Sequence, residues 1–315
     1  MTAWRLLADI GGTNARFART DEGGGIVARH DFKVRDFSDF DDALDAYLKL
    51  TGGAEGCVMA AISAAGPVLD GRVQLTNAHW RISEESVSAK IGTPARLLND
   101  LEAVAHALPV LQSGDVVAFG PARLSQASAK RMLAVNVGTG FGAALIVRSA
   151  QGWTSVPGEA GHMSIGGEDA RELSLLAPEF TVEDVISGYG LLALYRKICQ
   201  RDQIRPSLED SAAVLAGAAT DGAAREALHH FTVWLARATR NLALASAVWD
   251  GVFLVGGVVE GWRQVADLDL FRAIFEEGGK MRLRLSRIPT MIITRADPAL
   301  IGLAALASDQ NLSRR

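Results

Sequence analysis

The chain has 315 residues, more than one hydrophobic core usually serves, so its length predicts two domains. Hydrophobic residues make up 49% and charged residues 22%, and a net charge of −4 without a Lys or Arg cluster argues against a nucleic-acid or membrane-surface partner. Two cysteines are too few for a disulfide framework, and the N-terminal apolar run is too short for a signal peptide, so we expect a cytoplasmic protein.

The first predicted element is a β-hairpin at residues 5–19, where the apolar run RLLADI is followed by the turn GGTN and a second alternating run. Residues 132–148, MLAVNV-GTGFG-AALIVR, repeat this pattern. In both places the glycines lead into a strand, whereas a Rossmann or Walker loop leads into a helix. The repeat therefore predicts an internal duplication in which a hairpin opens each half.

Strands and helices alternate along the rest of the chain, which predicts an α/β fold with a mostly parallel core sheet in each half. The apolar stretch 242–259 is interrupted by Asp250 and by glycines, so it favours a helix, a turn and a strand over a membrane span. The expected strands lie at 57–62, up to Leu98, and at 251–257, and the expected helices at 40–50, 99–108, 168–176, 181–198, 223–249 and from Pro298 onward.

The first glycine turn has the composition of a phosphate site. Glycines let backbone N–H groups approach a phosphate, small polar side chains add donors, and Asp9 can hold Mg²⁺ through water. A plain tight hairpin explains this turn alone equally well. The residues in question are Gly11, Gly12, Thr13 and Asn14.

The second turn contains Gly138, Thr139 and Gly140. Because it occupies the equivalent position in the other half of the chain, we expect the two turns to bind the two ends of a triphosphate. A third glycine pair, Gly256 and Gly257, follows a predicted buried strand, where a flat base has room. The chain has no Walker A sequence, which argues against P-loop chemistry.

Seven segments, in order along nearly the whole chain, resemble the bacterial glucokinase family of the hexokinase, actin and Hsp70 superfamily. They are DIGGTNARFA (9–18), LTNAHW (75–80), LLNDLEAVAHAL (97–108), AVNVGTGFG (134–142), PGEAGHMSIG (157–166), VEDVISGYGLLALY (182–195) and FLVGGVVEG (253–261). The resemblance implies a duplicated actin-like ATPase (ribonuclease H-like) fold with a sugar cleft between two domains. The small α/β domain would span 1–108 plus about 298–315 and the large one 109–297, and such proteins are commonly homodimers.

The resemblance also implies site residues. Asn99 and Asp100 match a sugar-binding pair, and Asp100 would accept the proton of the attacking hydroxyl; the alternative is an ordinary helix cap. Glu159 and His162 match sugar contacts, and Glu183 matches a glutamate near the anomeric end of the sugar. Their alternatives are a solvated loop carboxylate, a loop-bracing histidine and an exposed glutamate in a first helical turn.

The expected reaction is transfer of the γ-phosphoryl group of ATP to the 6-hydroxyl of glucose, with ATP and Mg²⁺ as cofactors. The alternatives are a kinase of mannose, fructose or an N-acetylhexosamine, a sugar-sensing protein without catalysis, and an Hsp70-like ATPase. The sequence departs from the family at SGYGL, where Tyr189 replaces a proline and leaves a freer and bulkier turn beside Glu183.

Overall fold

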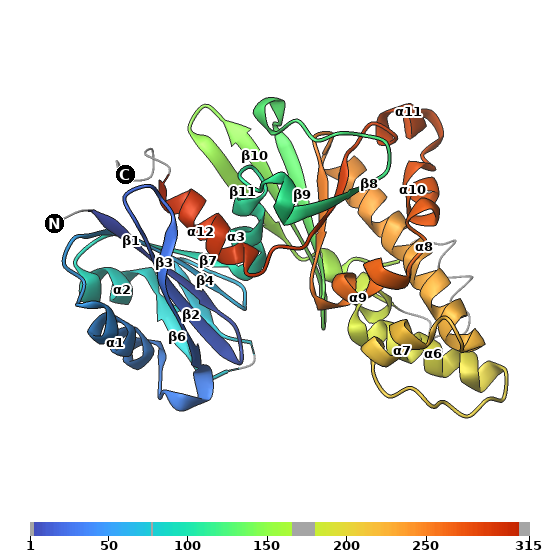
Figure 1. The fold of residues 1–315 in the computed structure, drawn as a ribbon, viewed down its shortest axis with the longest axis horizontal. Helices are drawn as coiled ribbons and strands as arrows, with labels where there is room; N and C mark the ends of the chain where they lie inside the picture. Colours follow the sequence, from blue (N-terminus) through green and yellow to red (C-terminus); the bar gives the residue numbers. More distant parts are fainter. Residues whose placement is uncertain (1–2, 77, 166–179, 309–315) are drawn as a thin grey trace. The chain divides into compact units, whose positions relative to one another are not determined.

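The computed structural model describes residues 3–76, 78–165 and 180–308, drawn in Figure 1. The chain divides into two compact units. Unit 1 comprises residues 1–111, 146–157 and 296–315, and unit 2 comprises residues 112–145 and 158–295. The helix predicted at 168–176 lies outside the described residues.

Unit 1 is built on a five-stranded sheet in the order β3-β2-β1-β4-β7. The predicted first hairpin is confirmed, since β1 and β2 pair antiparallel. Only β1, β4 and β7 are parallel, and β3 pairs antiparallel with β2, so a mostly parallel sheet was too broad an expectation for this half. The strands are β1 (Trp4–Ile10), β2 (Asn14–Thr20), β3 (Ile26–Lys33), β4 (Cys57–Ala64) and β7 (Ala95–Asn99), with a separate small hairpin of β5 (Arg72–Gln74) and β6 (Arg81–Ser83).

Helices of unit 1 hold the sheet through close packing. Helix α12 lies beside α3 (Figure 1), and a Cβ on Gly302 would stand 1.7 Å from the carbonyl oxygen of Ala103, so only glycine permits this approach. The core contains fully buried aromatic rings, among them Phe17 and Tyr47, which stack 5.3 Å apart. The helices are η1 (Val34–Asp36), α1 (Phe40–Thr51), α2 (Glu84–Ile91), α3 (Asp100–Ala107) and α12 (Pro298–Ser308).

The second sheet has six strands in the order β11-β10-β9-β12-β13-β8. The predicted second hairpin is confirmed as β9 and β10, which are neighbours in this order. Strands β9, β12 and β13 are parallel, whereas β8 pairs antiparallel with β13. The strands are β8 (Val116–Phe119), β9 (Arg131–Val137), β10 (Phe141–Ser149), β11 (Gly152–Gly158), β12 (Val252–Val255) and β13 (Thr290–Ile293).

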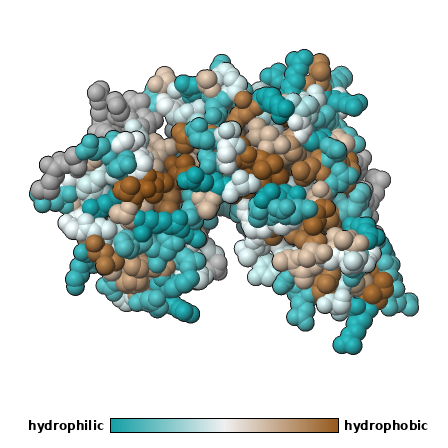
Figure 2. Space-filling view, viewed as in Figure 1, coloured by the Kyte–Doolittle hydropathy of each residue, from teal (hydrophilic) through white to brown (hydrophobic). Residues whose placement is uncertain are grey.

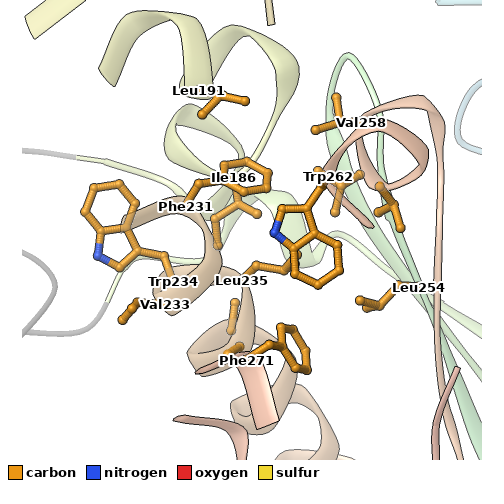
Figure 3. Close-up of a cluster of buried hydrophobic side chains, with 14 of the residues drawn as sticks. Ile186, Leu191, Phe231, Val233, Trp234, Leu235, Leu254, Val258, Trp262 and Phe271 are labelled. Atoms are coloured by element: carbon orange, nitrogen blue, oxygen red, sulfur yellow. The ribbon is translucent and has the colours of Figure 1, made fainter. Parts of the chain in front are cut away.

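The helices of unit 2 surround a large apolar core (Figure 3), in which Phe231 and Leu235 of α8 meet Trp262 of α9 and Phe271 of α10. The helix predicted at 181–198 is divided into α5 and α6, because Ser187 adopts an extended backbone and caps a new helix. The long helix predicted to reach 249 ends at Ala245. The helices are η2 (Ser113–Asp115), η3 (Gln126–Ser128), η4 (Ala160–His162), α5 (Val182–Val185), α6 (Gly188–Arg201), α7 (Ser211–Gly217), α8 (Gly222–Ala245), α9 (Gly257–Val265), α10 (Leu268–Glu276), η5 (Gly279–Met281) and α11 (Arg282–Leu285).

Within the described ranges, none of the helices combines the length and hydrophobicity that crossing a bilayer requires. Hydrophilic and hydrophobic residues are interspersed over the face of the molecule seen in Figure 2.

Candidate active site

The turn between β1 and β2 is tightly closed. The backbone N–H of Gly11 donates to the carbonyl oxygen of Asn14 at 2.9 Å, and the N–H of Val34 donates to the carbonyl oxygen of Thr13 at 3.0 Å. The ammonium group of Lys33 lies 2.6 Å from Oδ1 of Asn14, so a positive charge stands beside the turn. Sequence reasoning missed Lys33, because it comes from β3, which was not predicted.

Asp9 stands near the end of β1, only 8% exposed, and both of its carboxylate oxygens are hydrogen-bonded. The hydroxyl of Ser63 donates to one oxygen at 2.8 Å, and the guanidinium of Arg16 donates to the other at 2.9 Å. Arg16 in turn lies 3.3 Å from a carboxylate oxygen of Asp297. The buried charge of Asp9 is therefore paired, as such a charge must be.

The sequence analysis predicted neither Arg16 nor Ser63 as a partner of Asp9, for different reasons. Arg16 faces Asp9 across the hairpin, so the register of the predicted turn would have revealed it. Ser63 comes from β4, and only the order of the sheet brings it to Asp9.

The register of the parallel strands brings the candidate residues of unit 1 to one edge of the sheet. Asp9 pairs with Ser63, which pairs with Leu98, and in the next row Ala64 pairs with Asn99. The carboxyl ends of β1, β4 and β7 thus lie together, and this is the edge where open α/β sheets bind their ligands. Asp100 follows β7 directly, at the first position of α3.

Asn99 is the N-cap of α3, as predicted. Its Oδ1 accepts from the N–H of Leu101 at 2.9 Å, and its amide donates to the carbonyl oxygen of Gly66 at 3.0 Å. Glu102 completes a capping box by accepting from the N–H of Asn99 at 3.1 Å. These bonds fix the chain direction at the junction and with it the position of Asp100.

Asp100 is exposed at the surface, and one of its oxygens accepts from the N–H of Leu101 at 2.8 Å. Although the side chain is exposed, the surrounding protein desolvates its carboxyl, and this raises the pKa of Asp100 above its ordinary value. The hydrogen bond from the N–H of Leu101 lowers the pKa and the negative charge of Asp9 raises it, and the net direction is upward because desolvation is the largest of these effects. A carboxylate that is accessible and more basic than usual suits proton abstraction.

The turn between β9 and β10 in unit 2 is held from two sides. The N–H of Gly138 donates to the carbonyl oxygen of Gly140 at 3.0 Å, and the carbonyl oxygen of Gly138 accepts from the N–H of Gly188 at 2.9 Å. The N–H of Phe141 donates to Oε2 of Glu183 at 2.8 Å. Glu183, predicted as a sugar contact, thus accepts a hydrogen bond from the backbone at the end of the second glycine turn and stabilises that turn.

The glycine pair after β12 lies against the same turn. Val255 pairs with Asn136 of β9, and Gly256 has a φ of 115°, with a would-be Cβ only 2.4 Å from the carbonyl oxygen of Val137. Only glycine therefore fits at 256. Gly257 begins α9 and borders a cavity of about 560 Å³ that is also lined by Gly138 and Thr139, so the two glycine motifs share one cavity of unit 2.

Glu159 is the residue before the single turn η4 and His162 is its last residue, and both are exposed. The N–H of His162 donates to the carbonyl oxygen of Glu159 at 3.1 Å. Between them Gly161 is buried, with a would-be Cβ 2.5 Å from the carbonyl oxygen of Phe141 and 3.3 Å from Oε2 of Glu183. Unit 2 therefore brings Glu159, His162 and Glu183 together beside the start of β10.

The residues described by the structure include no cluster of three or more His, Cys, Asp or Glu side chains arranged to hold a metal ion. Asp9 can still serve Mg²⁺, because each of its bonded oxygens keeps a second lone pair for a metal-bound water. Arg16 already neutralises the charge of the Asp9 carboxylate, so Asp9 is better suited to contact Mg²⁺ through a water molecule than to ligate it directly.

Comparison with known proteins adds to this geometry. A sequence model of the family described as glucokinase matches residues 6–310. A glucokinase of Chromobacterium violaceum is 35% identical over 319 residues, covering 98% of this chain and 90% of its own, and one of Erwinia tasmaniensis is 32% identical over 319 residues, covering 97% of each. The crystal structure of a glucokinase from an Antarctic psychrotroph superposes with a TM-score of 0.85 at 29% identity, covering 97% of this chain and 99% of its own.

Proposed function

The chain belongs to the glucokinase family, and from this premise we propose that it transfers the γ-phosphoryl group of ATP to the 6-hydroxyl of glucose, with Asp100 as the general base. Membership makes the protein an ATP-dependent hexose kinase of the actin-like, two-domain fold. The observation that best supports the role of Asp100 is its place beside Asp9 at the carboxyl edge of β1, β4 and β7, accessible and with a raised pKa.

In the proposed reaction, Asp100 takes the proton of the 6-hydroxyl while the hydroxyl oxygen forms a bond to the γ-phosphorus. The bond between that phosphorus and the bridging oxygen of ADP breaks, and the products are glucose 6-phosphate and ADP. General-base assistance of this kind contributes about 10²–10⁴ in rate. The capping bonds of Asn99 hold the base in one position, which supports the proximity part of catalysis.

We propose that the two glycine turns hold the polyphosphate. The N–H groups of Gly11 and Gly138 close the two turns, and the backbone N–H groups of residues 12–14, with Lys33 beside them, and of residues 139–140 are suited to oxyanions. Asp9 would hold Mg²⁺ through water, and the bound ion would neutralise negative charge on the β- and γ-phosphates. Gly256 packs closely against the second glycine turn, and Gly257, with open space at its would-be Cβ, leaves room for the nucleoside in the adjoining cavity.

Sugar recognition is assigned to Asn99, Asp100, Glu159, His162 and Glu183 as a proposal from the family resemblance. Fixed donors and acceptors of this kind reject sugars that lack one hydroxyl, by about 10⁴-fold in favourable cases. We also propose a cytoplasmic homodimer, and a small domain of 1–108 plus about 298–315 that acts with the domain 109–297 on one bound hexose.

The test is a coupled assay of ADP release with MgATP and a panel of glucose, mannose, fructose and N-acetylglucosamine. We expect glucose to give the highest kcat/KM and little ATP loss without sugar. Preference for another hexose would correct the substrate, and ATP hydrolysis that no sugar stimulates would favour an ATPase. Sugar binding without turnover would favour a sensing protein.

Asp100→Asn tests the general base, with Asp36→Asn as a matched control, since Asp36 is exposed in the same unit and pairs only loosely with Arg35 at 3.7 Å. We expect Asp100→Asn to lower kcat by about 10²–10⁴ with ATP affinity nearly unchanged, and Asp36→Asn to have no effect. Normal turnover in Asp100→Asn would remove Asp100 from the mechanism.

A further inference from the structure

Among the described residues of unit 2, Tyr189 is the most exposed large hydrophobic side chain. It is 75% exposed, whereas the other tyrosines of the chain, Tyr47 and Tyr195, are fully buried. A side chain so accessible contributes little to the stability of the fold, since burial of apolar area is what stabilises. It nevertheless lines the cavity of about 560 Å³ that contains Gly138 and Thr139 of the second glycine turn.

The backbone around Tyr189 is fixed at both sides. Gly188 donates to the carbonyl oxygen of Gly138 at 2.9 Å, and the hydroxyl of Ser187 accepts from the N–H of Gly190 at 3.0 Å. A Cβ on Gly190 would stand 2.5 Å from the carbonyl carbon of Val185, so α6 is packed tightly there. The backbone at position 189 is thus held by its neighbours, contrary to the freer turn expected from the sequence, and Gly188 links it to the turn that holds phosphate in the proposed function.

The cavity offers two surfaces for a flat ring. On one side, Tyr189 and Leu192 stand at i and i+3 on α6 and share a face of that helix. Gly257 and Val258 line the cavity from the first turn of α9, where the absent side chain of Gly257 leaves open space. A Cβ built on Gly188 would lie 3.3 Å from the carbonyl oxygen of Gly138 and 3.4 Å from a methyl group of Val258. Gly188 therefore joins the wall of the cavity to the second glycine turn.

We propose that the ring of Tyr189 is the surface on which the purine base of the bound nucleotide stacks, with Gly257 and Val258 lining the opposite side. This inference rests on the proposed function, because it takes residues 138–140 to bind the polyphosphate of the same nucleotide. Stacking of an aromatic side chain on the face of a base increases the affinity of the protein for the nucleotide. Tyr189 is therefore a nucleotide-affinity residue.

The experiment measures binding to the full-length protein by calorimetry, with the non-hydrolysable ATP analogue AMP-PNP and with inorganic tripolyphosphate, which has no base. A stacked base contributes affinity equivalent to about 5- to 150-fold in Kd. We expect Tyr189→Ala to raise the Kd of AMP-PNP by about tenfold and to leave that of tripolyphosphate unchanged. Tyr189→Phe keeps the ring and should stay within about twofold of the wild type.

Leu283→Ala is the matched control, since Leu283 is 68% exposed in the same unit and lies on α11, away from the residues that line the cavity. Tyr189→Leu is the second variant: it keeps apolar bulk without a flat ring and should weaken AMP-PNP as Tyr189→Ala does. Unchanged AMP-PNP binding in Tyr189→Ala would overturn the stacking role. So would an equal loss for tripolyphosphate, which would mean that the residue acts through the glycine turn.

The two proposals fail in different ways. A wild-type protein that phosphorylates glucose with ATP, together with variants at position 189 that bind AMP-PNP normally, refutes the stacking role alone. A wild-type protein that neither binds AMP-PNP nor phosphorylates a hexose refutes the proposed function, and the stacking role with it.

Discussion

Replacement of Gly140 by alanine should disrupt the second glycine turn through Glu183. A Cβ at position 140 would stand 2.4 Å from Oε2 of Glu183 and 3.1 Å from its carboxyl carbon, so the carboxylate has to move. It then loses the 2.8 Å bond from the N–H of Phe141. Hydrogen bonds to charged groups contribute about 1.5–3 kcal/mol, and that is the expected loss of stability.

Gly138→Ala provides a matched control in the same turn. The nearest atom to its would-be Cβ is the amide nitrogen of Asn136 at 4.0 Å, and neither glycine has a positive φ. A glycine whose backbone tolerates alanine gains about 0.4–1 kcal/mol on substitution, because the unfolded chain loses freedom. The two variants should therefore shift stability in opposite directions.

Thermal unfolding followed by calorimetry without nucleotide measures the difference. For a domain of this size, about 1.5–3 kcal/mol corresponds to a lower Tm by roughly 3–12 °C. In a Glu183→Ala background the carboxylate is gone, so Gly140→Ala should add less than about 0.5 kcal/mol. Equal Tm shifts for both glycine variants, or an undiminished effect in the Glu183→Ala background, would refute the reasoning.

The remaining predictions concern unit 1. The pKa of Asp100 is raised in the folded protein, so ionisation of this carboxyl costs stability, and the free energy of unfolding falls as the pH rises from 3.8 through the raised pKa. Asp100→Asn should therefore have a higher Tm than the wild type at pH 7 and an equal Tm below pH 3.8. A lower Tm at pH 7 would contradict the direction of the shift. The same carboxyl must be ionised to act as a base, so kcat/KM for glucose should fall with decreasing pH through a pKa above 3.8. A pH profile of kcat/KM that stays flat down to pH 3.8 would exclude Asp100 as the titrating group. Gly302→Ala forces α12 away from α3 and should lower the free energy of unfolding in urea by about 1–3 kcal/mol or more. The control is Gly114→Ala in unit 2, where the would-be Cβ has open space, and it should be near neutral; similar losses for both would argue against the close packing of the two helices.

Local patterns in the sequence predicted much of the fold. Both glycine hairpins, the helix at 40–50, the cap at Asn99 and the start of the last helix at Pro298 are confirmed, because periodicity, turn residues and caps act over a few positions. Antiparallel strand β3 and its Lys33 were not predicted. The division of the helix at 181–198 was also missed, since an internal serine caps a new helix only when its own backbone is extended.

The candidate catalytic and binding residues could be named from sequence patterns, and the pairing of Asp9 with Arg16 follows from the hairpin register. Three contacts depend on the folded chain: the hydrogen bond of Ser63 to Asp9, the hydrogen bond of the N–H of Phe141 to Glu183, and the place of Tyr189 in the cavity of the second glycine turn. The reason is physical. A register within one hairpin is set by neighbouring residues, whereas contacts between distant segments depend on the order of strands in the sheet and on how closely helices pack, which no local pattern encodes.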